Sequence, residues 1–247
     1  MKKRKILFNL IIFAACCLVF LVGDTLAYEM QEYFPLNEGD FWVYSLKVNE
    51  GGKDSIEEEI IKIKGTEDFG GVETKKMLSA KTENQCMSID AEGVKLYKAW
   101  GWAGVGGDYE IYNPPKVLFP NMSIGETKNY KLDIGTYGIN DVISKTSLKS
   151  GTLTITLDGI EDVEVPAGKF KDCLKFTTIY DYKWINKEQQ PSKQIFVTWL
   201  AKGIGKIKSE ITISEYVGLP NRERDEIAEL IELKEASING VRFSVGQ

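Results

Sequence analysis

The sequence contains no histidine among its 247 residues. This absence excludes the Ser-His-Asp and Cys-His catalytic arrangements and the H-E-x-x-H zinc site, and it removes the commonest general acid or base near neutral pH. The chain also lacks an S-x-x-K motif and a G-x-S-x-G elbow, and Gly203-Ile204-Gly205-Lys206 matches only part of a phosphate-binding loop. The sequence therefore predicts no catalytic residues and no cofactor.

Cysteine is scarce as well. Two of the four cysteines, Cys16 and Cys17, fall in the N-terminal segment described next, which leaves Cys86 and Cys173. Two distant cysteines without histidine cannot build a tetrahedral zinc site, so no metal site is expected. In an oxidising compartment the pair forms one disulfide, or each is a small buried apolar side chain; both alternatives stay open at this point.

Residues 1–27 have the pattern of an export signal. Basic residues at positions 2–5 precede an apolar stretch from Ile6 to Gly23, and the small residue Ala27 marks the expected cleavage position. The mature chain then begins at Tyr28, in the periplasm or outside the cell. An uncleaved membrane anchor and a lipoprotein signal with Cys16 as the lipidated residue are the minority alternatives, and only through them would the protein contact a membrane.

Removal of this segment leaves residues 28–247 with 27 Lys and Arg against 35 Asp and Glu, a net charge of −8. A mildly acidic chain without a basic, aromatic-rich patch argues against nucleic acid as a partner. The remaining length is typical of one β-rich domain.

Nearly all of this domain has the alternating, β-branched pattern of strands. In Thr152–Leu157, for example, Leu153, Ile155 and Leu157 share one face and are expected in the core. Residues 222–238, within the C-terminal segment 217–247, fit either one short helix or a last strand. The expected strands are 41–48, 56–64, 72–80, 85–90, 94–102, 127–132, 142–148, 152–157, 163–165, 170–184, 193–201 and 206–216.

An internal echo divides the domain. Phe34-Pro35 is followed by Gly39-Asp40 and Tyr44, and Phe119-Pro120 is followed in the same order by Gly125-Glu126 and Tyr130. Proline restricts the backbone before the turn to an extended conformation, and glycine permits the sharp turn that leads into a strand. The echo predicts two similar halves, about residues 33–116 and 117–216, with Pro114-Pro115 breaking any strand at the join.

Acidic clusters and aromatic residues are the remaining candidates for function. Glu57–Glu59 and Asp158–Asp162 contain the carboxylates that a histidine-free glycoside hydrolase would need, but solvated edges explain such runs better. The aromatics fit core packing, or the wall of a cavity for an apolar ligand inside a curved sheet. The candidate cavity residues are Trp42, Tyr44, Trp100, Trp184 and Trp199.

Three stretches carry a resemblance: Tyr33–Tyr44, Val163–Cys173 and Trp199–Ile207. They resemble a loose group of exported bacterial proteins of unknown function that are built from antiparallel sheets. In that group an aromatic such as tyrosine often stands at the position of Trp199. By fold analogy, the resemblance extends distantly to the half-barrels that carry lipoproteins or lipids across the periplasm.

The sequence thus predicts an all-β fold, an antiparallel, strongly curved sheet or open half-barrel of about ten to twelve strands. The favoured function is a non-enzymatic exported envelope protein that binds an apolar molecule or a lipidated partner in the concavity. A protein–protein interaction or assembly module of the envelope is the alternative, and a carboxylate-based hydrolase is the least favoured.

The export hypothesis yields a mass prediction. We expect the intact mass of the protein recovered from its own envelope to correspond to a chain that begins at Tyr28, because peptidases cleave after small residues such as Ala27. A mass that includes residues 1–27 would instead indicate an anchor. A chain that begins at Cys16 with added acyl mass would indicate lipidation.

Overall fold

Alternating apolar and polar residues form strands along nearly all of the chain that the computed structural model describes, namely residues 27–80, 84–100, 109–137, 146–184, 191–219 and 222–244. Residues 1–26 of the expected export signal, which spans residues 1–27, lie outside these ranges. No helix within them is long and apolar enough to cross a membrane. The elements are η1 Met30–Glu32, β1 Phe41–Glu50, β2 Lys53–Phe69, β3 Val72–Ser79, β4 Asn84–Asp90, β5 Gly93–Trp100, β6 Tyr109–Pro120, β7 Thr127–Tyr137, β8 Thr146–Val165, β9 Gly168–Trp184, β10 Pro191–Ala201, β11 Gly205–Leu219, β12 Arg222–Ile238 and β13 Val241–Ser244.

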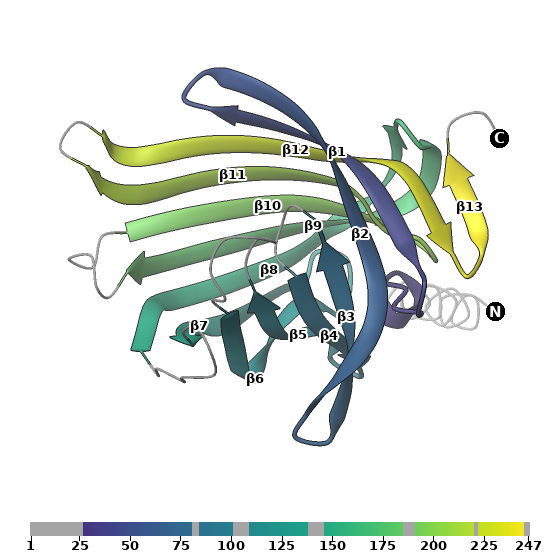
Figure 1. The fold of residues 1–247 in the computed structure, drawn as a ribbon, viewed down its shortest axis with the longest axis horizontal. Helices are drawn as coiled ribbons and strands as arrows, with labels where there is room; N and C mark the ends of the chain where they lie inside the picture. Colours follow the sequence, from purple (N-terminus) through teal and green to yellow (C-terminus); the bar gives the residue numbers. More distant parts are fainter. Residues whose placement is uncertain are drawn as a thin grey trace, which may run out of the picture.

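All 13 strands belong to one antiparallel sheet whose order follows the chain from β1 to β13. In addition, β1 pairs with β12, from Phe41 opposite Ser237 to Glu50 opposite Ile227. Figure 1 shows β8 to β12 as a broad curved layer, with β2 to β6 turning across it. The sheet is not closed, because β6 and β7 pair only at two positions near the start of β6. The predicted all-β, strongly curved open sheet is confirmed.

The C-terminal segment is a strand. Residues 222–238 form β12 throughout and not a helix. β12 lies between β1 and β11, which supply hydrogen-bond partners along its two edges. Pairing on both sides satisfies the backbone N–H and C=O groups of β12. These tertiary hydrogen bonds outweigh the local helix propensity of the segment.

The prediction that Pro114-Pro115 breaks any strand at that point was wrong, since β6 runs through both prolines. The β5–β6 register shifts at this point: Leu96 lies opposite Lys116 and Lys98 lies opposite Ile111. Residues 112–115 therefore bulge opposite Tyr97 alone, where no ladder N–H is required. A bulge tolerates the two prolines within one continuous strand.

The sequence echo has a structural counterpart in the turns 37–40 and 123–126. In each turn the backbone N–H of the first residue donates to the carboxylate of the fourth, at 3.1 and 2.9 Å. The glycine of each turn has a positive φ, +89° and +80°, and its N–H donates to the carbonyl oxygen of Ile63 or Leu157. The two Phe-Pro segments also meet, with the ring centroids of Phe34 and Phe119 5.7 Å apart. The division into halves at 33–116 and 117–216 stays a prediction.

Two clusters form the described core. One surrounds η1 and includes Met30, Phe34, Leu153, Ile155, Leu157 and Phe176. The other brings together the three stretches that carried the resemblance, and it includes Trp42, Tyr44, Val163, Val165, Ala167, Cys173, Trp199, Ile204, Ile207 and Leu233. The Ala167 N–H donates to the Leu233 carbonyl oxygen at 2.8 Å, so the tip of the β8–β9 hairpin is fixed onto β12.

The two cysteines are small buried side chains and do not form the disulfide that the sequence left open. Cys86 on β4 and Cys173 on β9 are both free thiols with no exposed surface. Their sulfur atoms approach different groups, the Glu67 carboxylate at 3.7 Å and the Phe170 carbonyl oxygen at 3.5 Å. Burial raises the pKa of each thiol to about 11, which keeps both protonated near neutral pH.

The close approach of β8 and β9 yields a stability prediction. A Cβ added at Gly151 would lie 2.0 Å from the carbonyl oxygen of Asp181, whereas a Cβ at Gly159 on the same strand would meet nothing within 4 Å. We expect Gly151→Ala to lower the free energy of unfolding by about 1–3 kcal/mol, because backbone atoms must move apart. Gly159→Ala is the matched control and should change it by less than about 0.5 kcal/mol. Equal urea midpoints for the two variants would contradict the packing argument.

Candidate functional site

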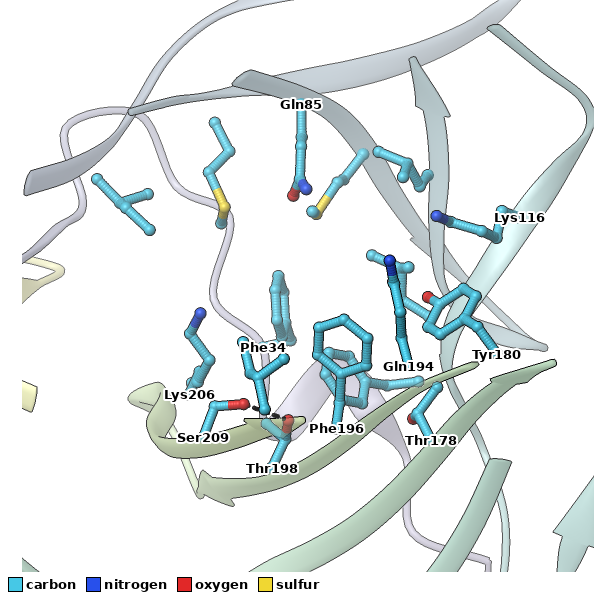
Figure 2. A pocket seen from close by; sticks show the side chains of 18 of the residues that line it. Phe34, Gln85, Lys116, Thr178, Tyr180, Gln194, Phe196, Thr198, Lys206 and Ser209 are labelled. Carbon is cyan, nitrogen blue, oxygen red and sulfur yellow. Dashed lines mark hydrogen bonds between the residues drawn. The ribbon is translucent and has the colours of Figure 1, made fainter. Parts of the chain in front are cut away.

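A cavity of about 360 Å³ lies inside the curve of the sheet. Its walls come from β1 to β6 on one side and β9 to β11 on the other, so it spans the concavity between the two layers (Figure 2). Most of the lining is apolar or aromatic, including Phe34, Trp42, Ile61, Met77, Met87, Leu96, Leu118, Phe119, Tyr182, Phe196 and Ile211. Its polar groups include Gln85, Lys116, Thr178, Gln194, Thr198, Lys206 and Ser209.

Strand alternation explains which side chains enter the cavity. Every second residue of β9, from Thr178 through Tyr180 to Tyr182, lines it, and β10 contributes Gln194, Phe196 and Thr198 in the same way. The residues between them face the opposite side of the sheet. The rings of Tyr180 and Phe196 pack edge to face with centroids 5.4 Å apart, so these two side chains of the cavity wall contact each other directly.

Two aromatic side chains of β1 close one end of the cavity against β11. The Trp42 indole N–H donates to the Ile204 carbonyl oxygen at 2.7 Å, and the Tyr44 hydroxyl donates to the Lys206 carbonyl oxygen at 2.8 Å. Burial, reinforced by the negative charge of Glu59, raises the pKa of Tyr44 well above its ordinary value, so its hydroxyl stays a donor. Both bonds cross over β12, which separates β1 from β11 in the sheet.

Lys206 enters the cavity because of a bulge in β11. Trp199 of β10 lies opposite Lys208, but the next residue, Leu200, lies opposite Lys206, so Ile207 is extra. Ser209 beyond the bulge faces the cavity, and strict alternation from it would turn position 206 away. The bulge reverses this, so Lys206 is half-buried and lines the cavity.

The ammonium of Lys206 lies 5.1 Å from the ring centroid of Tyr44. Within the described part of the chain it donates no hydrogen bond and no carboxylate forms a salt bridge with it. Burial lowers the pKa of Lys206, while the nearby carboxylates of Glu59 and Glu229 act in the opposite direction. Burial also raises the pKa of Glu229, with a further contribution from Glu59.

The structure brings together some of the sequence-predicted aromatic residues and not others. Trp42 and Tyr44 line the cavity. Trp199 does not: it faces away, its indole N–H donates to Glu161, and Lys175 and Lys208 lie over its ring. Trp100 is also absent from the lining and lies beneath Lys98, while the side chain of Trp184 is outside the described residues.

Sequence reasoning missed Lys206 and the inward aromatics of β6 and β10, such as Tyr112 and Phe196. The alternation of residues 193–198 could have indicated Phe196 once the inward face was known. Lys206 had no local signal, because a bulge is fixed by pairing with β10. Among the described residues no group of three or more cysteine and acidic side chains is arranged to hold a metal ion.

Comparison with known proteins gives one family and two solved structures. The model of the family DUF3108-like matches residues 47–212, which is more than half of the chain. A proposed lipoprotein from Parabacteroides distasonis is 14% identical, with a TM-score of 0.38 and coverage of 81% of this chain and 97% of that one. A proposed exported protein with a YmcC-like fold from Bacteroides fragilis is 13% identical, with a TM-score of 0.33 and coverage of 82% and 98%.

Both TM-scores are low, so neither structure lends weight to a function for this chain. No curated protein matches the sequence. The family match begins within β1 and ends within β11 and therefore includes most of the cavity lining but neither Trp42 nor Tyr44.

The hydrogen bond of Tyr44 yields a matched test. Tyr44→Phe removes the donor to the partly buried Lys206 carbonyl oxygen, and we expect the free energy of unfolding to fall by about 1–2 kcal/mol. Tyr130 occupies the corresponding position of the second turn, and its hydroxyl donates no hydrogen bond to a described residue. Tyr130→Phe should therefore change stability by less than about 0.5 kcal/mol in the same urea titration. Equal losses for both variants would show that the bond to β11 is not what Tyr44 contributes.

Proposed function

We propose a binding function for this chain, which belongs to the DUF3108-like family. In this proposal it is a non-enzymatic exported protein that encloses an apolar molecule, or the lipid group of a lipidated partner, in the concavity of its sheet. The export pattern of residues 1–27 supports a location outside the cytoplasm. The acidic composition gives no reason to expect nucleic acid as a partner.

The observation that carries the proposal is the cavity itself. Its volume of about 360 Å³ lies within the range of small-molecule sites, roughly 300–1,000 Å³. Its lining is mostly apolar and aromatic with a few convergent polar groups, which is the usual composition of such sites. Transfer of a ligand methylene from water into such a lining contributes about 0.8 kcal/mol.

The exposed apolar surface gives less support to an assembly module. Large exposed apolar side chains among the described residues are distributed over β2, β3, β8, β13 and the turn 121–126. Single exposed apolar residues are ordinary on protein surfaces and do not by themselves mark an interface. The cavity with its apolar lining is the more specific feature.

A pair of variants on β9 tests the proposal. Thr178 points into the cavity, while its neighbour Thr177 lies on the other face and donates to Asp158 at 2.6 Å. We expect Thr178→Phe to fill the cavity and prevent ligand retention, and Thr177→Phe to leave retention unchanged. The measurement is native mass spectrometry of each protein purified from its own envelope, followed by solvent extraction of any retained molecule.

The proposal requires a retained apolar mass in the wild type and in Thr177→Phe that is lost in Thr178→Phe. A wild-type spectrum with only the bare chain, together with no binding of added long-chain alcohols, would overturn it. A retained protein that is insensitive to Thr178→Phe would favour the interaction module instead.

A further inference from the structure

The polar part of the cavity points to a particular class of ligand. We infer that the ligand is a single-chain amphiphile whose acidic headgroup, a carboxylate or a phosphate monoester, binds the ammonium of Lys206. This inference rests on the proposed function and adds the chemistry of the headgroup to it.

The first argument is the position of Lys206. Lys206 is half-buried in the cavity wall, and even partial removal of a lysine charge from water is costly unless a counter-charge is supplied. Here the chain departs from regular pairing at Ile207, and the departure turns Lys206 inward while Lys208 stays outward. Bulges that re-aim a side chain are typical of functional sites. The bulge thus places the ammonium of Lys206 in a mostly apolar cavity, whose other charged lining residues are Lys116 and Glu110.

The second argument is the absence of a direct counter-ion. Glu59 is buried and acts on Lys206 electrostatically, but its carboxylate accepts a hydrogen bond from the Ser79 hydroxyl at 2.5 Å and it does not line the cavity. Glu229 acts from the side of β12. The two carboxylates favour the charged form of Lys206 without forming a salt bridge with it in the described structure. An acidic headgroup in the cavity would supply the missing contact.

The third argument is the set of neighbouring donors. Figure 2 shows Thr198 and Ser209 beside Lys206 on the same wall. Their hydroxyl groups share one hydrogen bond of 3.0 Å in which either oxygen can be the donor. One hydroxyl hydrogen of the pair therefore remains to donate to a headgroup oxygen. An ammonium and a hydroxyl donor together suit an oxyanion and not a cationic or purely apolar group.

The fourth argument concerns the chain. Met77, Met87 and Leu96 line the cavity from β3, β4 and β5, whereas Lys206 lines it from β11. Methionine fills irregular space and adapts to flexible partners. A volume of about 360 Å³ is near the lower limit for ligand sites, which favours one acyl chain over a lipid with two.

Lys116 is the competing anchor, and its surroundings disfavour it. Its ammonium lies 4.6 Å from the Tyr112 ring centroid and 5.3 Å from that of Tyr180, and it donates to the Tyr112 hydroxyl at 3.5 Å. That hydroxyl in turn donates to Glu110 at 2.5 Å. Lys116 is therefore already part of a hydrogen-bonded group that includes a carboxylate.

The experiment measures binding of dodecanoate, dodecyl phosphate and dodecanol to the full mature chain by isothermal titration calorimetry. Wild type should bind at least one of the two acids about tenfold or more tightly than the alcohol. Lys206→Met, which keeps the length of the side chain, should abolish this preference and leave dodecanol affinity within about twofold. Lys116→Met is the matched control and should keep the preference. The ratio of the two acid affinities identifies the headgroup.

Three outcomes would overturn the inference: no acid preference in wild type, a preference that survives Lys206→Met, or a preference lost only in Lys116→Met. If dodecanol binds in these cases, the proposed function stands while the headgroup assignment fails. If none of the three ligands binds, the proposed function fails as well. Circular dichroism and the dodecanol affinity of each variant separate a lost headgroup contact from a misfolded chain.

Discussion

The pairing of β1 with β12 is the constraint on which the rest of the structure depends. It joins residues 41–50 to residues 227–237, two segments that are far apart in the strand order. Such a long-range pairing must overcome a large loop-closure entropy, and it does so with a continuous ladder and with buried bonds from side chains. The Trp42 indole and the Tyr44 hydroxyl both reach over β12 to carbonyl oxygens of the segment 204–206. Curvature of the sheet is therefore fixed by specific donors as well as by twist.

The cavity is a consequence of this curvature. A sheet held in a tight curve presents the inward face of both layers to a common space, and the large side chains that point there do not fill it completely. Trp42 and Tyr44, which belong to the second core cluster, close one end. The bulge at Ile207 then determines the chemistry of that end, because it exchanges an apolar side chain for Lys206. The curvature of the sheet thus determines the position of the cavity, and the bulge at Ile207 determines the polarity of one end.

Much of the strand content was predictable, and the exceptions have physical reasons. The alternation in Thr152–Leu157 places Leu153, Ile155 and Leu157 in the core, where all three are fully or almost fully buried. β6 was not foreseen, because two prolines argue against a strand unless a bulge removes the need for their N–H groups. Trp199 was expected at the cavity with Trp42, yet the face it occupies depends on the register of β10 against β9 and β11. A shift of one residue moves a side chain to the opposite face, and local sequence does not record such shifts.

Local sequence by itself determined the fold class, the turns and the chemistry that the protein lacks. The positive-φ glycines of the turns 37–40 and 123–126 and the alternating apolar residues are local properties, as is the absence of histidine. Only the tertiary structure decided that residues 222–238 are a strand, that the two cysteines stay apart, and that Lys206 faces a cavity. Each of these depends on which strand lies beside which, and in what register. That information resides in pairings between distant segments, where long-range hydrogen bonds and burial outweigh local propensity.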